Sequence, residues 1–315
     1  MAAAANLLVM PMNIRYKMKK VASNLTVLVV LSVFALGFLF PILVTLTNAL
    51  MTSFEINNRY GMQVLPVNYF RLLDEIPHIN FADMTLIPSW LSLEQYATLL
   101  FDTPSYMVHF WNSIIITVPS VMGQLLVAIP AVYVFEMSKW RHKEILFFTY
   151  IVVMLMPLPV VLVPQFVVAG FIGIQDSVLA VILPAIFSPF AVFLLRQFLK
   201  GVSMECLEAA KIDGAGHIVI LAAIVTPLLK PAIVATGILI YIDYWNIVEQ
   251  AIVFIPDVSR LPLSVALTNI SPEIIFAAAC FYMLPALLVF LYGQEYLVEG
   301  IQLSAIKTSG AAYEL

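Results

Sequence analysis

The sequence predicts an all-α membrane protein with about six transmembrane helices. Its 315 residues are 62% apolar and 11% charged, whereas soluble domains average about 45–50% and about 25%. A spanning helix needs about 20 apolar residues, and the chain holds roughly six such runs joined by loops. The composition therefore indicates a helical bundle in a lipid bilayer, and no basic block indicates a nucleic-acid partner.

The first expected helix sets the orientation of the others. We expect the helices at roughly 21–50, 106–134, 145–169, 178–199, 228–254 and 276–298. The run at 21–50 follows a basic segment and resembles a signal peptide, but about 30 apolar residues without an A-x-A cleavage site are typical of a retained signal anchor. An even number of spans places both termini on one side, so residues 1–20 and 299–315 are expected in the cytoplasm.

The distribution of lysine and arginine supports this orientation. Both residues are enriched in the cytoplasmic loops of membrane proteins. Of the fifteen in this chain, only Arg59, Arg71 and Arg260 fall on the expected outer side. The other twelve are Arg15, Lys17, Lys19, Lys20, Lys139, Arg141, Lys143, Arg196, Lys200, Lys211, Lys230 and Lys307. Inverting the chain would place these twelve on the wrong side of the membrane.

The segment 51–105 is polar by the standards of this chain. It carries several prolines and eight charged side chains: Glu55, Arg59, Arg71, Asp74, Glu75, Asp83, Glu94 and Asp102. We expect it to form an extracytoplasmic loop or small cap. The core of the protein, with the five other helices, then lies at 106–298.

Prolines are concentrated in the third expected helix, at Pro157, Pro159 and Pro164. Each removes a backbone donor, and the carbonyl that loses its partner must be satisfied by neighbouring helices or water. A kinked packing helix is the favoured interpretation here, ahead of a helix broken to line a pathway.

A charged gap between the fourth and fifth helices has the features of a short helix on the inner face of the membrane. Residues 204–213 favour helix, Ser203 is a suitable N-cap, and Gly214 can end the helix in the left-handed conformation. Small alanines at 209 and 210 would let another protein approach the backbone closely. On residue types alone, however, any amphipathic loop helix between spans would look alike.

The spacing of this gap is more specific than its composition. Glu208-Ala209-Ala210 is followed after three residues by Gly214, after nine more by Ile224, and then by Pro227. In this respect the segment 200–227 resembles the EAA loop of ATP-binding cassette (ABC) importer permeases. Thr226 stands where that family usually has leucine, and Ser203 where its sugar-type subfamily often has proline.

The resemblance extends over most of the chain and is strongest to the maltose-type permeases for carbohydrates. Further matching segments are Leu93-Glu94-Gln95-Tyr96, Asn112-Ser113-Ile114-Ile115, Pro189-Phe190, Arg196-Gln197-Phe198, Trp245-Asn246 and Ser304-Ala305-Ile306-Lys307. The resemblance implies the type I ABC importer permease fold in a bacterial or archaeal cytoplasmic membrane. It also implies half of a translocation pore, completed by a second permease subunit, with an extracytoplasmic solute-binding protein delivering a mono- or oligosaccharide.

The same resemblance assigns the energy coupling to the loop. Two ABC ATPase subunits would bind ATP and dock on the EAA helices of the two permease subunits. In this chain the docking residues would be Glu208, Ala209, Ala210, Asp213, Gly214, Ile224 and Pro227. The chain itself has no G-x-x-x-x-G-K-[ST] phosphate loop. It is therefore expected to be a subunit that is not itself an enzyme and carries no cofactor of its own.

Other candidate chemistry is sparse. His78, His109, His142 and His217 stand far apart, so no metal site or histidine-based catalytic site is expected. Asp243 is a carboxylate in or near a span, where charge usually faces a cavity or a partner. It lies among Tyr241, Tyr244, Trp245 and Asn246, which could stack on a sugar and bond to it. The competing interpretation is an interfacial aromatic belt with Asn246 packing between helices.

Three alternatives stay open at this point. A permease for peptides or polyamines would share the EAA loop. A secondary transporter driven by an ion gradient would permit Asp243, but it predicts inverted repeats or paired broken helices, and neither is evident in the sequence. A membrane scaffold that recruits a cytoplasmic partner would explain the loop and leave Asp243 and the third helix without a role.

Overall fold

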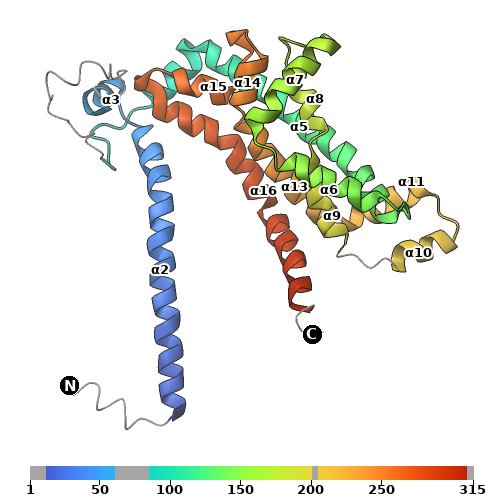
Figure 1. Ribbon diagram of the computed structural model, residues 1–315. Coiled ribbons are helices and arrows are strands. Elements are labelled where there is room, and N and C mark those ends of the chain that lie inside the picture. Colours follow the sequence, from blue (N-terminus) through green and yellow to red (C-terminus); the bar gives the residue numbers. More distant parts are fainter. Residues whose placement is uncertain (1–11, 61–84, 201–204, 311–315) are drawn as a thin grey trace. The chain divides into compact units, whose positions relative to one another are not determined.

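The computed structural model describes residues 12–60, 85–200 and 205–310 (Figure 1), with side chains for 24–60, 85–200 and 207–297. Every regular element in these ranges is a helix, so the predicted all-α class is confirmed. By its internal contacts the chain divides into two compact units. The first is Met1–Tyr96 with Pro272–Cys280, and the second is Ala97–Ser271 with Phe281–Leu315.

The first unit contains the N-terminal helix α2 (Met12–Asn48). Its segment Asn24–Asn48 has a mean hydropathy of 2.9, and 6% of its most apolar window is buried within the chain. A helix that is apolar around its whole circumference is stable in lipid rather than in water. The structure starts this helix nine residues before the expected position at 21, so the basic residues that precede the apolar run lie on its first turns.

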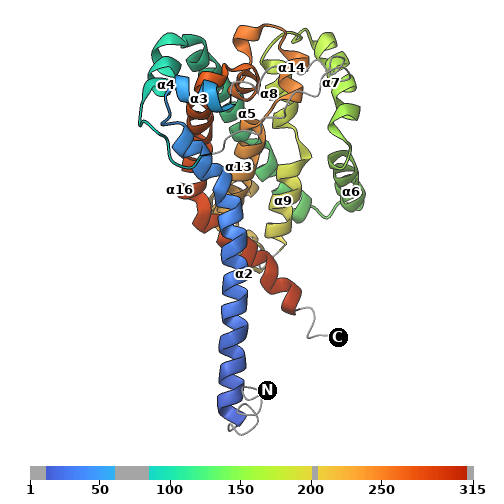
Figure 2. The ribbon, with the colours of Figure 1, turned by 90° about the vertical axis from the view of Figure 1, so that its left-hand side faces the viewer.

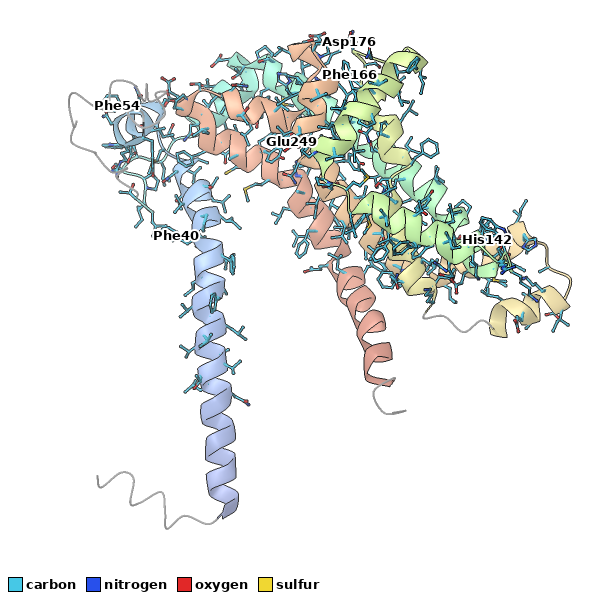
Figure 3. All side chains as sticks on the ribbon, viewed as in Figure 1. Phe40, Phe54, His142, Phe166, Asp176 and Glu249 are labelled. Atoms are coloured by element: carbon cyan, nitrogen blue, oxygen red, sulfur yellow. The ribbon has the colours of Figure 1, made fainter. Side chains whose placement is uncertain are left out.

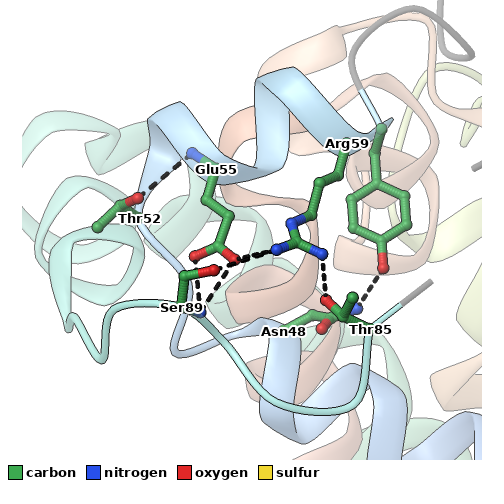
Figure 4. Close-up of polar contacts among 7 residues, drawn as sticks. Asn48, Thr52, Glu55, Arg59, Thr85 and Ser89 are labelled. Carbon is green, nitrogen blue, oxygen red and sulfur yellow. Dashed lines mark hydrogen bonds and ion pairs between the residues drawn. The ribbon is translucent and has the colours of Figure 1, made fainter. Parts of the chain in front are cut away.

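The short helix α3 (Ser53–Tyr60) is held by a polar network (Figure 4). The carboxylate of Glu55 accepts a hydrogen bond of 3.0 Å from the Ser89 amide and pairs with Arg59 at 3.0 Å. Arg59 donates in turn to the hydroxyl of Thr85 at 2.7 Å. Burial raises the pKa of Glu55, but the hydrogen bonds from Ser89 and the charge of Arg59 outweigh it and bring the pKa below its ordinary value of 4.5.

Gln95 joins three segments of the first unit. Its buried side-chain amide donates to the carbonyls of Asn48 and Met51, at 2.7 and 2.9 Å, and so satisfies the end of α2. Its oxygen accepts a bond of 3.3 Å from the amide of Ala277, in the first turn of α16 (Ile275–Gly310). The expected external segment 51–105 is thus structured where it is described, and it contains α3, α4 (Glu94–Ala97) and η3 (Thr98–Asp102).

The second unit is built on α5 (Pro104–Met137), a helix of 34 residues. It contacts α8 (Leu179–Ile186), α9 (Pro189–Leu199) and α13 (Lys230–Trp245) (Figure 2). Buried apolar side chains form one cluster around Val132, Leu195 and Leu229 and another around Ile116, Val181 and Ala251. The remaining elements are α6 (Lys143–Met154), α7 (Leu158–Ile172), α10 (Glu205–Ile212), α11 (His217–Ile220), η4 (Leu221–Val225), α12 (Thr226–Leu228), α14 (Glu249–Phe254), η5 (Val258–Arg260), α15 (Leu263–Ala266), η6 (Leu267–Asn269) and, in the first unit, η7 (Pro272–Ile274).

In the described ranges, four helices are long and apolar enough to cross a membrane. The count rises to six if each of two bent helix pairs is one span, which agrees with the number that the sequence predicts. The pair α6 and α7 is bent by 103°, and the pair from His217 to Leu228 and α13 is bent by 74°. The interpretation of the third helix as merely kinked is therefore wrong, because the helix is broken. Its break falls at Met156, since the following Pro157 disfavours a helical backbone for the residue before it.

The fifth expected helix, 228–254, is shorter than the sequence indicated. It ends at Trp245, and helix resumes only with α14. The side-chain amide of Asn246 donates to the carbonyl of Ile242 at 2.7 Å, which offers the backbone a partner other than the next helical turn. The last helix is longer than expected, because α16 continues beyond 298 to Gly310.

Candidate coupling loop and translocation cavity

The helix α10 ends at the glycine that the sequence indicated. Gly214 has a φ of +82°, in the left-handed region that favours glycine. Its amide donates to the carbonyl of Lys211 at 3.1 Å, and the amide of Ala215 donates to that of Ala210 at 3.0 Å. These two bonds form the Schellman motif, which satisfies the last carbonyls of a helix. The predicted N-cap Ser203 lies outside the described residues.

One face of the loop is anchored on the helical core, and the other face is open. Leu207, Ile220 and Val225 are buried in the same apolar cluster as residues of α5, α9 and α13, and Ala210, Ala215 and Ile224 pack against it. The opposite face exposes Glu208, Ala209, Lys211, Ile212 and Asp213. The loop therefore forms a shelf with one buried face and one exposed face.

Two isoleucines on the open side were missed by the sequence analysis. Ile212 is 86% exposed and Ile218 is 82% exposed, although isoleucine is one of the residues most often buried. The helical period could have found the first of them. Leu207 and Ala210 share one face of α10, and Glu208 and Ile212, which are four residues apart, share another.

The chain leaves the loop through a turn of π-helix, η4, and the short helix α12. Thr226, which stands where the resembling family usually has leucine, donates from its hydroxyl to the carbonyl of Leu221 at 2.8 Å. Pro227 follows Thr226 in α12, which continues η4 without a break. His217 is exposed, and its Nδ1 lies 2.8 Å from the hydroxyl of Tyr133 on α5. Threonine in place of the family's usual leucine at 226 therefore leaves η4 and α12 intact.

A buried arginine lies where the core meets the loop. The side chain of Arg196, on α9, is 1% exposed. It donates to Glu144 of α6 at 2.6 Å and pairs with Glu136 of α5 at 3.4 Å, and its guanidinium lies 4.0 Å from the centre of the Phe147 ring. This contact set joins three helices four residues before Lys200 and the entry into the loop. The sequence shows three separate charges and no signal that they meet.

Two of the five predicted pathway residues, Tyr241 and Trp245, stack on one another. Trp245 is buried, with its ring stacked between Tyr241 and Tyr282 at centroid distances of 5.6 and 6.0 Å. Its indole nitrogen donates to the carbonyl of Tyr282 at 3.1 Å. These contacts fix the end of α13 against α16, and neither Trp245 nor Tyr241 lines the cavity formed by the other three.

The other three, Asp243, Tyr244 and Asn246, line a cavity of about 450 Å³. Its remaining walls are Leu158, Ile247, Val248, Glu249 and Gln250; Figure 3 labels Glu249 on α14. Asn246 donates to Ile242 and accepts from the hydroxyl of Tyr282 at 2.6 Å, which leaves one donor and one acceptor of its amide for another partner. The cavity thus combines carboxylates, amides and an aromatic ring, and its wall includes no lysine, arginine or histidine.

The histidines do not meet in the described part of the chain. No three histidine, cysteine, aspartate or glutamate side chains come together as a metal site in the described residues. His109 lies 2.7 Å from the carbonyl of Leu261, and His78 falls outside the described residues.

Comparison with known proteins places these features in a family. Residues 96–302 match the family described as "binding-protein-dependent transport system inner membrane component". Among curated relatives, the arabinooligosaccharides transport system permease protein AraQ of Bacillus subtilis is 27% identical over 231 residues, which cover 71% of this chain and 82% of AraQ. The melibiose/raffinose/stachyose import permease protein MelC of the same species is 29% identical over 238 residues, covering 72% of this chain and 86% of MelC.

A solved structure shares the fold. It is a chain of a bacterial ABC transporter involved in the import of the acidic polysaccharide alginate, with a TM-score of 0.71 and 21% identity, and the match covers 88% of this chain and 97% of that one. The family match spans about two thirds of the sequence and contains the loop, the buried arginine and the cavity. The chain therefore belongs to the inner-membrane components of binding-protein-dependent transport systems, as a multi-pass membrane protein.

Proposed function

We propose that the chain is a permease subunit of an ATP-driven importer for a mono- or oligosaccharide. The single observation that carries this proposal is the loop from α10 to α12. One face of this loop is buried against the core, the other is exposed, and Gly214 ends its first helix. Such a shelf offers an ATPase a docking surface, through which conformational change can be transmitted without any catalytic group on the loop. The names of the sugar permeases AraQ and MelC support the cargo class.

In this proposal the chain forms half of a translocation pore with a second permease subunit. Two ABC ATPase subunits bind ATP and dock on the loops of the two permeases, and the loop of this chain contributes Glu208, Ala209, Ala210 and Asp213, with Ile212 and Ile218 as apolar contacts. A solute-binding protein delivers the cargo on the opposite side. The loop and both termini lie in the cytoplasm, which is supported by the distribution of basic residues.

The cavity beside α13 is the proposed cargo path. Asp243 and Glu249 can accept hydrogen bonds from sugar hydroxyls, Asn246 and Gln250 can both donate and accept, and Tyr244 offers a ring for stacking. A few polar groups converging on a concave wall are typical of small-molecule sites. Trp245 and Tyr241 hold this wall in place from behind.

Transport by the assembled complex tests the proposal. The chain is purified from its native membrane with its associated subunits, reconstituted in vesicles and supplied with the co-encoded binding protein. We expect ATP hydrolysis to rise with one neutral saccharide among a panel that also contains a peptide and spermidine. Stimulation by the peptide or spermidine alone would overturn the cargo class. Uptake driven by an ion gradient without ATP would overturn the importer itself.

A further inference from the structure

A second cavity, of about 410 Å³, lies at the junction of α5 and α6, and none of its lining residues belongs to the proposed cargo path or to the coupling loop. Its wall consists of Pro130, Ala131, Val134, Phe135, Ser138, Trp140, Lys143, Leu146 and Tyr150. All of these come from the last two turns of α5, the connection that follows and the first two turns of α6. The cavity therefore belongs to one helix corner at a membrane boundary.

The wall is apolar over most of its length and polar at one end. Val134, Leu146 and Trp140 are exposed to the surroundings of the chain, which for side chains on membrane-spanning helices means lipid. Trp140 and Tyr150 are the residue types that prefer the boundary between hydrocarbon and headgroups. Ser138 and Lys143 supply polar groups near the connection.

The charge at this end is positive because Lys139, Arg141, Lys143 and Arg196 outnumber the two local carboxylates. Lys139 and Arg141 are exposed on the connection beside Lys143. The carboxylates of Glu136 and Glu144 both pair with Arg196. The ammonium of Lys143 donates to the backbone carbonyl of Glu136 at 3.3 Å, which holds it at the cavity.

We propose that this corner binds an anionic phospholipid, with an acyl chain along the apolar wall and the phosphate at Lys143, Arg141 and Lys139. Basic pockets between membrane helices are suited to acidic headgroups, and each lysine or arginine near an anionic surface strengthens attraction by about fivefold. A free phosphate would pair with the cations and make no use of the apolar wall. A neutral lipid would leave three cations without a partner in the ligand.

Trp140 provides a direct readout, because lipids with brominated acyl chains quench tryptophan fluorescence at contact distance. The full chain is reconstituted with its subunits in nanodiscs containing increasing fractions of dibrominated phosphatidylglycerol or dibrominated phosphatidylcholine. The Trp140 signal is the difference between the wild type and Trp140→Phe. We expect the phosphatidylglycerol midpoint to fall at a fraction at least about fivefold lower.

Matched variants separate the contributions of charge and shape. Lys143→Gln with Arg141→Gln should bring the two midpoints together, whereas Lys143→Arg should keep them apart. Arg260→Gln is the control, because it removes one exposed positive charge from the distant η5 turn. Ala131→Phe fills the apolar wall and should lower quenching by both lipids.

Several outcomes would overturn the proposal. Equal midpoints for the two lipids in the wild type would mean ordinary annular lipid. No quenching of Trp140 by either lipid would mean that another subunit covers the corner. Loss of the lipid preference on adding soluble glycerol phosphate would reveal a phosphate site in place of a lipid site.

Discussion

The coupling loop and the cavity beside α13 are both functional candidates, but they are built in different ways. The loop depends on backbone shape: a left-handed glycine, two closing hydrogen bonds and an apolar underside at fixed spacing. The cavity depends on convergence, since its wall comes from the start of α7, the end of α13 and the start of α14. A site built from backbone shape can be recognised in the sequence by the spacing of its residues. A site built from residues of several helices can be recognised only by residue types, because the sequence does not show which of them meet.

The strongest test of this contrast reverses one charge on the open face of the loop. We expect Glu208→Lys to abolish transport while the protein stays at wild-type level in the membrane, because the side chain is exposed and supports docking rather than folding. Uptake of cargo and membrane abundance are measured together. The control Glu273→Lys makes the same charge change at an exposed position of the first unit. Wild-type uptake by Glu208→Lys, with normal ATPase association, would remove the loop from the coupling path.

Replacing the arginine behind the loop tests whether the shelf needs a rigid base. Arg196→Met leaves Glu136 and Glu144 without their cation and should lower the free energy of unfolding by about 3 kcal/mol, near the lower end for a broken buried pair because Glu144 is largely exposed. Thermal unfolding of the purified complex measures this change. Arg196→Lys keeps the positive charge but lacks the forked guanidinium, so it should recover part of the lost free energy of unfolding. Equal stability of Arg196→Met and the wild type would show that the ion pairs do not hold the corner.

Variants of the cavity should change the affinity for cargo rather than the coupling of transport to ATP hydrolysis. Asp243→Asn is expected to raise the KM for cargo about tenfold, as for loss of one hydrogen bond to a charged group, with unchanged basal ATP hydrolysis. Asn246→Ala and Tyr244→Ala should weaken cargo-stimulated transport more than basal hydrolysis, and Asn246→Ala should also lower thermal stability because it removes the bond to Ile242. Tyr241→Phe, which keeps the ring stacked on Trp245, is the control. If all four variants transport alike, the cavity is a packing feature.

The smallest effect compares two glycines of the same loop. Gly214→Ala places a side chain at a φ of +82° and should destabilise the loop by about 1 kcal/mol. Gly216→Ala should cost less, because its φ is −70°, no atom lies within 4 Å of the added carbon, and only the weaker N-cap preference of alanine opposes the change. Hydrogen exchange at the amides of residues 214 and 215 measures the difference. Equal protection in both variants would mean that the left-handed turn does not limit the stability of the loop.

The parts of the fold that the sequence could predict are those governed by local rules. Apolar runs of sufficient length predicted the spans, and Gly214 marked a helix end that the closing hydrogen bonds confirm. The break at Met156 was misjudged because a proline kinks a helix in some surroundings and ends it in others. The side chains next to it decide the outcome, and they come from elsewhere in the chain.

The contacts of Arg196 illustrate what the sequence could not predict. Its partners Glu136 and Glu144 lie 60 and 52 residues earlier in the chain, and nothing in their local sequence indicates that they meet one cation. The cavity has the same limitation. Asp243, Tyr244 and Asn246 were identified by type, but Glu249, Gln250 and Leu158 join them only because α13 ends at Trp245.

The break between α6 and α7 also has a consequence for the synthesis of the protein. The two helices have 12 and 15 residues, and at 1.5 Å per residue neither can cross about 30 Å of hydrocarbon alone. Where the bent pair forms one span, both halves must therefore enter the bilayer together as one hydrophobic unit. A polar residue introduced at Met156 would weaken this unit and lower the efficiency with which the pair inserts.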